Sequence, residues 1–422
     1  MPLVNSRAET RIGYPIALEP LSLRAVTQAK AIVAATLAAN LVRENRSRLA
    51  RRLAHRGNSV GSPLGSRVPI SHDRLPALHQ AVPTMGPFDA VSNDVLALQA
   101  LLQGSGYRSE VFAEHVHASL RGRVHSLDSL SDPDVDADPL LYHVSTQAPR
   151  VVGVLLERSG PVYLRHHNIT PAEWFTGIRA GHEAACREAR SELAQLGAIA
   201  QAGTADSAYN ADELLGIGMR NVDVVPILLA PAEDPPVWTG GGGYAITVGR
   251  IAPNKRIDFA LRSIAAYQQL HDPGFGLVIV GSDRGMERYA DACRSLEAEL
   301  GVRNVRWVGS VEEAEKLRLM AEADAYLCAS DHEGFCVPIV ESFRLGLPVV
   351  ARATSAVTDT CGEALAVDTA DPAFLANVLR VVVDDAELRT RLLATQREEA
   401  KRFEPALVGE QVLAWARSHV AR

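Results

Sequence analysis

The sequence predicts an α/β protein made of two domains, each built around a parallel β-sheet. Its 422 residues exceed the roughly 250–300 at which a single hydrophobic core stops growing. Hydrophobic residues make up 47% of the chain, which is enough to fill more than one core. Short apolar strands alternate with helical patterns in two successive series, and this alternation is typical of parallel sheets covered by helices.

Residues 1–75 differ from the rest, and we expect a helical extension followed by a linker. From about Leu21 to Leu53 apolar residues recur at helical spacing, whereas Gly57 to Pro69 is rich in glycine, serine and proline. We expect this helical layer to pack on the first domain or on a second subunit, which makes a homo-oligomer one option. Residues 1–60 carry ten Lys or Arg against three Glu, so docking on an anionic membrane is another option, although the Ala-rich face lacks aromatic anchors.

The first alternating series occupies residues 76–230. Helices are expected at Val95–Gln103 and from about Pro171 to Leu196. We expect a C-terminal helix at 403–422 to complete this domain. The expected strands are Leu78–Val82, Ser109–Ala113, Leu140–Val144 and Val162–His166.

The second series occupies residues 236–402 and follows a linker at Pro231–Gly243, which holds three prolines and four consecutive glycines. Two such domains joined by a short linker predict a ligand cleft at the carboxyl ends of their strands. The expected strands are Tyr244–Val248, Leu277–Val280, Val305–Val308, Ala325–Cys328 and Pro348–Ala351.

The strongest chemical signal follows the strand Ala325–Cys328, where Glu333 and Glu341 are separated by seven residues. Pro338 suits the first turn of a helix, and the free N–H groups of a helix start attract an anion. Gly334 allows the backbone to approach a ligand. We therefore expect two carboxylates aimed into one cleft to bind hydroxyl groups. Ordinary helix-terminal acids are the alternative.

A second signal follows the strand Tyr244–Val248, where Gly249, Arg250 and Lys255 come in succession. A guanidinium binds two oxygens as a fork and an ammonium adds a point charge, so the pair suits a diphosphate. A charged surface loop is the alternative. The next strands end in Gly281-Ser282 and Gly309-Ser310, where small residues let a nucleotide pass close to the backbone.

These residues resemble family 4 of the glycosyltransferases, whose hallmark is Glu, seven residues, Glu, preceded by a Gly-Arg…Lys phosphate clamp. The sequence is similar to a bacterial subset whose three motifs occur here as Pro253–Arg256, His332–Pro338 and His167–Pro171. The match covers about residues 80–400. It implies the GT-B fold, in which two Rossmann-like domains face each other across a cleft, here with an N-terminal helical extension.

The resemblance implies a retaining enzyme that moves a sugar from a UDP or GDP type donor to a small-molecule, glycan- or lipid-linked acceptor, in secondary-metabolite or surface-glycan biosynthesis. It assigns the catalytic roles to His167, Arg250, Lys255 and Glu333. The implied donor-binding residues are Gly249, Ser282, Gly309, Val311, Gly334, Phe335, Cys336, Val337 and Glu341. The implied acceptor side comprises Asp89, Ser92, Asn93, His143 and Asn168.

Two points of this assignment stay open at the level of sequence. His166 adjoins His167 and could be the packing residue of the two. The loop around Asp89 carries Phe88 where the subset has glycine, which weakens the expected contacts from this loop. A front-face displacement, in which the departing phosphate deprotonates the acceptor, is the mechanism that the family implies. It requires no metal and no cofactor.

Other classes of function are less well supported. The acidic body, within a net charge of −7, disfavours nucleic acid as a partner. Five scattered cysteines without zinc spacing favour reduced thiols in the cytoplasm, and no signal peptide is evident. A phosphorylase or epimerase on the same fold and a non-catalytic sugar-nucleotide binding protein remain the alternatives.

Overall fold

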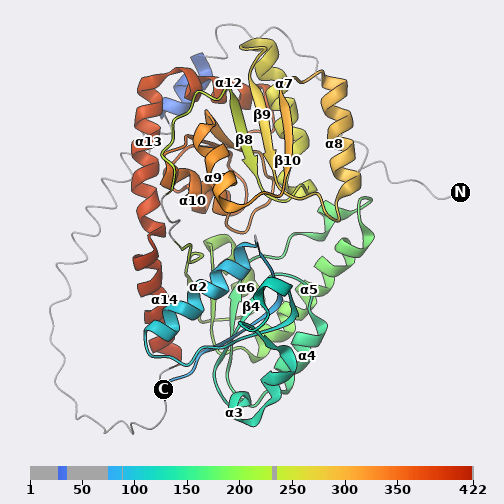
Figure 1. Cartoon of the computed structure of the whole chain (residues 1–422), viewed down its shortest axis with the longest axis vertical. Coiled ribbons are helices and arrows are strands. Elements are labelled where there is room, and N and C mark those ends of the chain that lie inside the picture. The colour runs from blue at the N-terminus through green and yellow to red at the C-terminus, as the bar shows by residue number, and fades with distance from the viewer. Residues whose placement is uncertain (1–26, 36–74, 88, 231–234, 421–422) are drawn as a thin grey trace, which may run out of the picture.

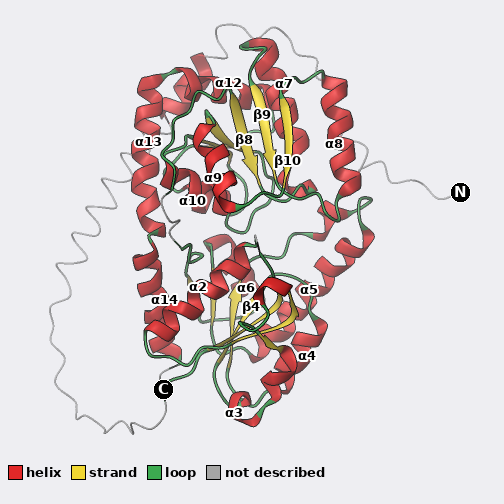
Figure 2. Cartoon of the chain, viewed as in Figure 1, coloured by secondary structure: helices red, strands yellow, loops and turns green. Residues whose placement is uncertain are grey.

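The computed structural model describes residues 27–35, 75–87, 89–230 and 235–420. The chain forms two α/β domains stacked along the long axis of the molecule (Figure 1). Helices flank each sheet, so the central strands have no face open to water (Figure 2). The strands Leu140–Val144, Val162–His166 and Gly276–Val280 are buried at every residue, as expected for parallel sheets covered on both faces.

The first sheet has seven parallel strands in the order β3-β2-β1-β4-β5-β6-β7. Its strands are β1 (His79–Met85), β2 (Val111–Val116), β3 (His125–Ser126), β4 (Leu140–Val144), β5 (Val162–His166), β6 (Gly203–Ala205) and β7 (Val222–Val224). The associated helices are α2 (Ala90–Gly104), α3 (Pro133–Asp136), α4 (Pro149–Glu157), α5 (Ala180–Ile199) and α6 (Ala208–Gly216).

The second sheet has six parallel strands in the order β10-β9-β8-β11-β12-β13. Its strands are β8 (Tyr244–Val248), β9 (Gly276–Val280), β10 (Val305–Gly309), β11 (Ala325–Cys328), β12 (Val349–Arg352) and β13 (Ala366–Val367). The helices that follow are α7 (Ile257–Leu270), α8 (Glu287–Leu300), α9 (Glu313–Glu322), α10 (Val337–Leu345), α11 (Val357–Cys361), α12 (Pro372–Asp384), α13 (Ala386–Ala400) and α14 (Pro405–His419).

In both sheets the strand order reverses beside the first strand, between β1 and β4 and between β8 and β11. Parallel sheets of this kind bind ligands at such a reversal, outside the carboxyl ends of the strands. The predicted fold class, α/β with two Rossmann-like sheets, is confirmed. The topology also directs attention to four loops, those that follow β1, β4, β8 and β11.

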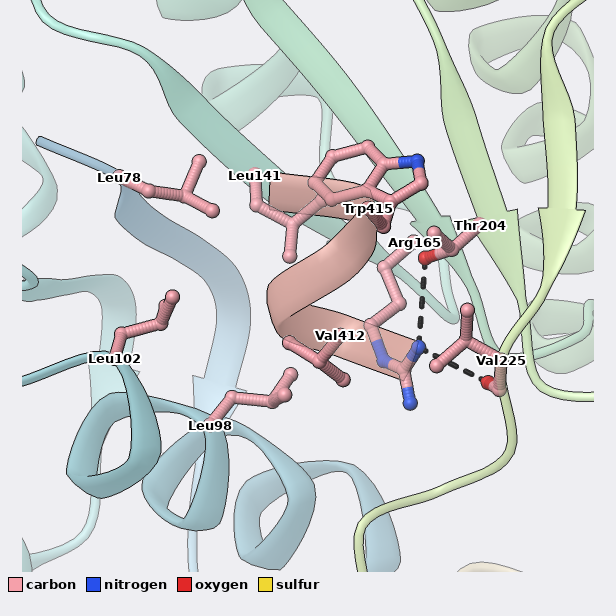
Figure 3. Close-up of a pocket in the computed structure, with 9 residues that line it drawn as sticks. All are labelled: Leu78, Leu98, Leu102, Leu141, Arg165, Thr204, Val225, Val412 and Trp415. Carbon is pink, nitrogen blue, oxygen red and sulfur yellow. Dashed lines mark hydrogen bonds between the residues drawn. The ribbon is translucent and has the colours of Figure 1, made fainter. Parts of the chain in front are cut away.

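The last helix returns to the first domain. Helices α13 and α14 run along one side of the molecule from the second domain to the first (Figure 1). Val408, Val412 and Trp415 of α14 are buried together with Leu98 and Leu102 of α2. A small apolar cavity remains between α14 and the first sheet, with the Arg165 side chain along it (Figure 3). Its lining is almost wholly aliphatic and aromatic, so we assign it to packing.

Two expectations about helices were wrong. The helix expected from about Pro171 begins only at Ala180, because a short 3-10 turn at Ala172–Phe175 is followed by Gly177 with φ of 76°. Residues 27–35 are helical, as expected, but they pack on the second domain of the same chain: Ala29 and Val33 are buried in the core that includes α7 and α12. The rest of the expected extension and linker lies outside the described residues.

An ion pair also joins the N-terminal helix to the second domain. Lys30 pairs with Asp385 at 3.1 Å, at the start of α13, which adds a contact between the N-terminal helix and the second domain.

None of the helices that the structure describes is both long and apolar enough to cross a bilayer.

Candidate active site

An open cavity with about 1040 Å³ of empty space lies between the two domains. Its wall is formed by loops that follow the carboxyl ends of strands in both sheets. The first domain contributes Asp89, Ala90, Val91, His167, Asn168, Thr170, Asp206 and Ile227. The second domain contributes Val248, Gly249, Arg250, Asn254, Lys255, His332, Glu333, Gly334, Phe335, Cys336, Val337 and Pro338.

The loop after β8 supplies two cations to this wall. Gly249 has φ of 144°, a conformation that favours glycine, and it turns the chain so that Arg250 and Lys255 both reach the cavity. Arg250 makes no hydrogen bond or ion pair with any residue that the structure describes. Desolvation lowers the pKa of its guanidinium. An unpaired cation on a cavity wall is suited to an anionic ligand.

Lys255 is held by a carboxylate. Its Nζ donates to Glu333 Oε2 at 2.5 Å, and the other Glu333 oxygen accepts from Ser330 Oγ at 2.7 Å. Burial acts to lower the pKa of Lys255, but the Glu333 carboxylate more than offsets it, so the pKa is raised. The Glu333 backbone N–H donates to Ser355 Oγ at 2.8 Å. Glu333 is therefore fixed at both its backbone and its side chain.

Helix α10 points its N-terminus at the same wall. Cys336 precedes it with φ of 71°, and no side chain caps the first turn. Pro338 lies in that turn, as predicted, where its missing N–H costs nothing. Uncapped N–H groups and the helix dipole make this end of α10 a site for an anion.

Glu341 is not among the residues that line the cavity, so its expected role in donor binding stays a prediction. One turn inside α10, its Oε1 accepts from Lys316 of α9 at 2.8 Å. Burial raises the pKa of Glu341, and Lys316 opposes this shift. Its other oxygen is buried without a hydrogen-bond partner.

Of the two adjacent histidines, His167 lines the wall, whereas His166 points into the first domain and bonds Glu213 at 2.7 Å. Both ring nitrogens of His167 are engaged: Nδ1 lies 3.3 Å from Asp206 Oδ2, and Nε2 lies 2.9 Å from His143 Nδ1. His143 is fully buried behind His167 and does not reach the cavity.

Of the other residues expected on the acceptor side, Asp89 and Asn168 line the cavity. Asp89 also caps α2 by accepting from the Ser92 N–H at 2.9 Å. Ser92 is buried, where its Oγ donates to Asp89 and accepts from the Gly86 N–H, so its role is local. Asn93 is exposed outside the wall. Phe88 lies outside the described residues.

Three residues expected to bind the donor base also lie outside the lining of the cavity. The Ser282 carbonyl accepts from the Ile251 N–H and the Gly309 carbonyl accepts from the Gly281 N–H, which ties the ends of neighbouring strands together. Val311 packs against the core of the second domain. Their expected role in recognising a base stays a prediction.

Sequence reasoning missed His332, Asp206 and Asn254 as wall residues. His332 belongs to a motif that was recognised in the sequence, but no role was predicted for this residue. Burial lowers its pKa to about 4. Asp206 directly follows β6, and polar residues at the carboxyl end of a parallel strand are the signal that could have found it. Asn254 is buried and donates to the His332 carbonyl at 3.1 Å.

The domains touch each other through hydrogen bonds beside the cavity. His332 Nε2 lies 2.7 Å from Asn168 Oδ1. Ser207 Oγ and Asn210 Nδ2 both donate to the Gly334 carbonyl, at 2.7 and 3.1 Å. The two domains are therefore bonded to each other beside the cavity, and the Gly334 carbonyl accepts two of these bonds.

Two clusters of metal-ligating side chains lie near the wall, Asp94 with His143 and His167, and Cys328 with Glu333 and Cys336. Both already have protein partners. Asp94 accepts from Arg165 Nε at 2.6 Å, and the Glu333 carboxylate forms an ion pair with Lys255. All five cysteines are free thiols, as the sequence predicts.

Comparison with known proteins relates the second domain to a known family. Residues 235–399 match the family model described as "Glycosyl transferases group 1". The chain is 35% identical over 170 residues to a D-inositol 3-phosphate glycosyltransferase from a Nocardioides species, covering 37% of each chain. It is 30% identical over 211 residues to the O-antigen chain mannosyltransferase B of Escherichia coli, covering 46% of this chain and 52% of that one.

Solved structures extend the likeness to both domains. Anabaena HepE, solved in complex with UDP and glucose, superposes with a TM-score of 0.63 over 81% of this chain and 100% of its own, at 16% identity. Sucrose-phosphate synthase from Thermosynechococcus elongatus gives 0.60 over 82% and 99%, also at 16% identity. The fold is therefore GT-B. The part of the chain that carries the cationic wall is similar to the group 1 glycosyl transferases, and the matched stretch spans about a third to a half of these curated relatives.

Proposed function

We propose that this chain is a retaining glycosyltransferase that moves a sugar from a UDP or GDP type donor to a small-molecule, glycan- or lipid-linked acceptor. The observation that carries the proposal is the wall contributed by the second domain. There the unpaired Arg250, the Lys255–Glu333 ion pair and the uncapped start of α10 converge on one cavity. A diphosphate offers the oxygens that such a wall binds, and a sugar offers hydroxyl groups to Glu333.

Glu341 fits this proposal as a residue for the ribose. Its Oε2 is a buried acceptor for which the described residues provide no hydrogen-bond partner, and Glu341 lies one turn inside α10. An unpaired buried acceptor costs free energy unless a ligand hydroxyl or water satisfies it. Two relatives support a hexose donor, the O-antigen chain mannosyltransferase B of Escherichia coli and a GDP-mannose:cellobiosyl-diphosphopolyprenol alpha-mannosyltransferase of Komagataeibacter xylinus.

In the proposed reaction, Arg250, Lys255 and the α10 amides stabilise the negative charge that develops on the leaving diphosphate. Removing one such donor from an active site typically costs about 10²–10³ in rate. These cations supply the charge for which other enzymes use a metal ion, so we propose transfer without a metal or cofactor. The five free thiols fit a cytoplasmic location, where thiols stay reduced.

The test measures donor binding and turnover with one set of variants. Thermal unfolding is followed with UDP-, GDP-, ADP- and dTDP-sugars, since a ligand at about 100 times its Kd adds about 2.7 kcal/mol of stability. We expect one nucleotide class to raise Tm and Arg250→Ala to abolish the rise. Arg288→Ala is the matched control, because Arg288 is an exposed arginine outside the wall.

Turnover then separates the functions. Release of the nucleotide in the presence of candidate acceptors, with the anomeric configuration of the product read by NMR, tests transfer and its stereochemistry. Product of inverted configuration would refute the retaining assignment. Binding without turnover for any acceptor or water would favour a non-catalytic sugar-nucleotide binding protein instead.

A further inference from the structure

We propose that Gln80 and His143 are positioning residues that fix His167 as a doubly protonated imidazolium in the cavity wall, so that it acts as a cation and not as a base. The protonation state follows from hydrogen bonds alone. Its consequence for sugar transfer rests on the proposed function.

The chain of hydrogen bonds begins at a backbone carbonyl, which can only accept. Gln80 Nε2 donates to the Val95 carbonyl at 3.2 Å. This contact sets the orientation of the Gln80 amide, because the opposite orientation would bring two oxygens together. Gln80 Oε1 therefore faces His143 Nε2, at 2.9 Å, and that nitrogen must carry a proton.

The next link is His143, which has room for one proton only. It is fully buried, and burial holds the pKa of its imidazole well below the ordinary value, with His167 and Arg165 acting in the same direction. Its single proton lies on Nε2, so its Nδ1 is an acceptor. His167 Nε2 lies 2.9 Å from that Nδ1 and must therefore donate.

The last link is Asp206, which faces the other nitrogen of His167. Its Oδ2 lies 3.3 Å from His167 Nδ1, and its Oδ1 accepts from Asn210 Nδ2. A carboxylate accepts, so Nδ1 carries the second proton of His167. The side chains of both residues are 1% exposed, and a buried carboxylate needs a counter-charge that the neutral Asn210 does not provide.

The other charges around His167 do not replace this pairing. Asp94 of α2 lies 3.8 Å from His167 Nε2, but Arg165 of β5 already neutralises it. His143 of β4 is neutral. The second domain adds the cations Arg250 and Lys255 and the neutral His332 across the cavity. Asp206 is therefore the anion that His167 balances.

The consequence for the reaction concerns the base. With a proton on each nitrogen, His167 has no lone pair with which to take the proton of an acceptor hydroxyl. The departing phosphate is then the base, and His167 adds a fixed positive charge on the first-domain side of the cavity, opposite Arg250 and Lys255.

The experiment reads the protonation state directly. Protein labelled with ¹⁵N-histidine gives ring nitrogen shifts, and loss of signals in His167→Gln identifies those of His167. We expect two N–H type nitrogens on His167 near neutral pH in the wild type. A nitrogen without a proton at that pH would overturn the proposal.

Variants at His143 test the positioning role. His143→Leu removes the acceptor for His167 Nε2–H, and we expect one proton to be lost from His167 and transfer to fall by up to about 10²-fold, with a new pH dependence near neutrality. His143→Asn keeps an oxygen close to the position of Nδ1 and should restore both the second proton and the flat pH profile. A His143→Leu enzyme with an unchanged pH profile and two N–H nitrogens would refute the role.

Gln80→Leu removes the preceding link of the chain of hydrogen bonds, and we expect it to cost His167 the same proton. It takes the place of His143→Leu in the test if that variant does not fold. The spectra do not depend on turnover. A protein without transferase activity that still shows two N–H nitrogens would refute the proposed function and leave the protonation state standing.

Discussion

Gly334 lies where the two domains approach closely, and its replacement by alanine tests whether this contact holds them together. A Cβ at this position would lie 2.9 Å from the His167 carbonyl oxygen and 3.2 Å from Asn168 Cγ, and would overlap Asn168 Cβ. Ordinary contacts between such heavy atoms are about 3.5–4.0 Å. The first-domain loop would have to move away by more than about half an ångström.

The magnitude follows from what this movement breaks. Forcing an extra methyl into a packed site costs about 1–3 kcal/mol. The movement also strains the bonds from Ser207 and Asn210 to the Gly334 carbonyl, at 2.7 and 3.1 Å. Because each domain keeps its own core, we expect the cost to fall on closure and to reduce the ratio of closed to open forms about 5- to 150-fold.

The assay combines shape with activity. In Gly334→Ala, small-angle scattering should report a larger radius of gyration, and kcat/KM should fall by the same factor, while Tm changes little. Gly153→Ala is the matched control, because a Cβ at exposed Gly153 in α4 meets no atom within 4 Å. If Gly334→Ala kept wild-type activity and wild-type scattering, the contact at Gly334 would not hold the cleft closed.

Three further outcomes follow from the site. EDTA should leave sugar transfer unchanged, and full loss restored by a divalent ion would contradict the cationic wall. His332 has a pKa of about 4 in the folded protein against an ordinary value of 6.5, so the unfolded state gains a proton first as pH falls. The free energy of unfolding should therefore fall by about 3 kcal/mol between pH 6.5 and pH 4. Urea unfolding of His332→Gln should lack this pH-dependent loss. Lys316→Met should leave Glu341 buried without its cation, with a Tm loss matching about 3–5 kcal/mol, whereas exposed Lys401→Met should lose almost nothing.

Much of the fold could be predicted because the signals are local. Strands such as Leu140–Val144 and Tyr244–Val248 are short apolar runs bounded by turns, and the structure has them at these bounds. The start of the helix expected from Pro171 was predicted wrongly, because the apolar pattern continues through Gly177, where a positive φ interrupts helical geometry. Periodicity alone carries no record of that turn.

Only part of the candidate site could be predicted from the sequence. Arg250, Lys255 and Glu333 follow predicted strands, so their convergence on one cavity was expected from the topology of parallel sheets. The pairing of Glu341 with Lys316 was not predicted, because Lys316 belongs to another helix. The contact of His332 with Asn168 was not predictable, since it joins residues 164 positions apart on different domains.

By itself, the sequence determined the class of the two sheets, the positions of their strands and the loops that carry charge, because these depend on hydrophobic period and on residues adjacent in the chain. Tertiary structure alone decided which side chains share a wall, which are paired behind it, and where the helix at 27–35 packs. Those outcomes depend on distances between segments remote in sequence, and hydrogen bonds and burial are set only when these segments meet.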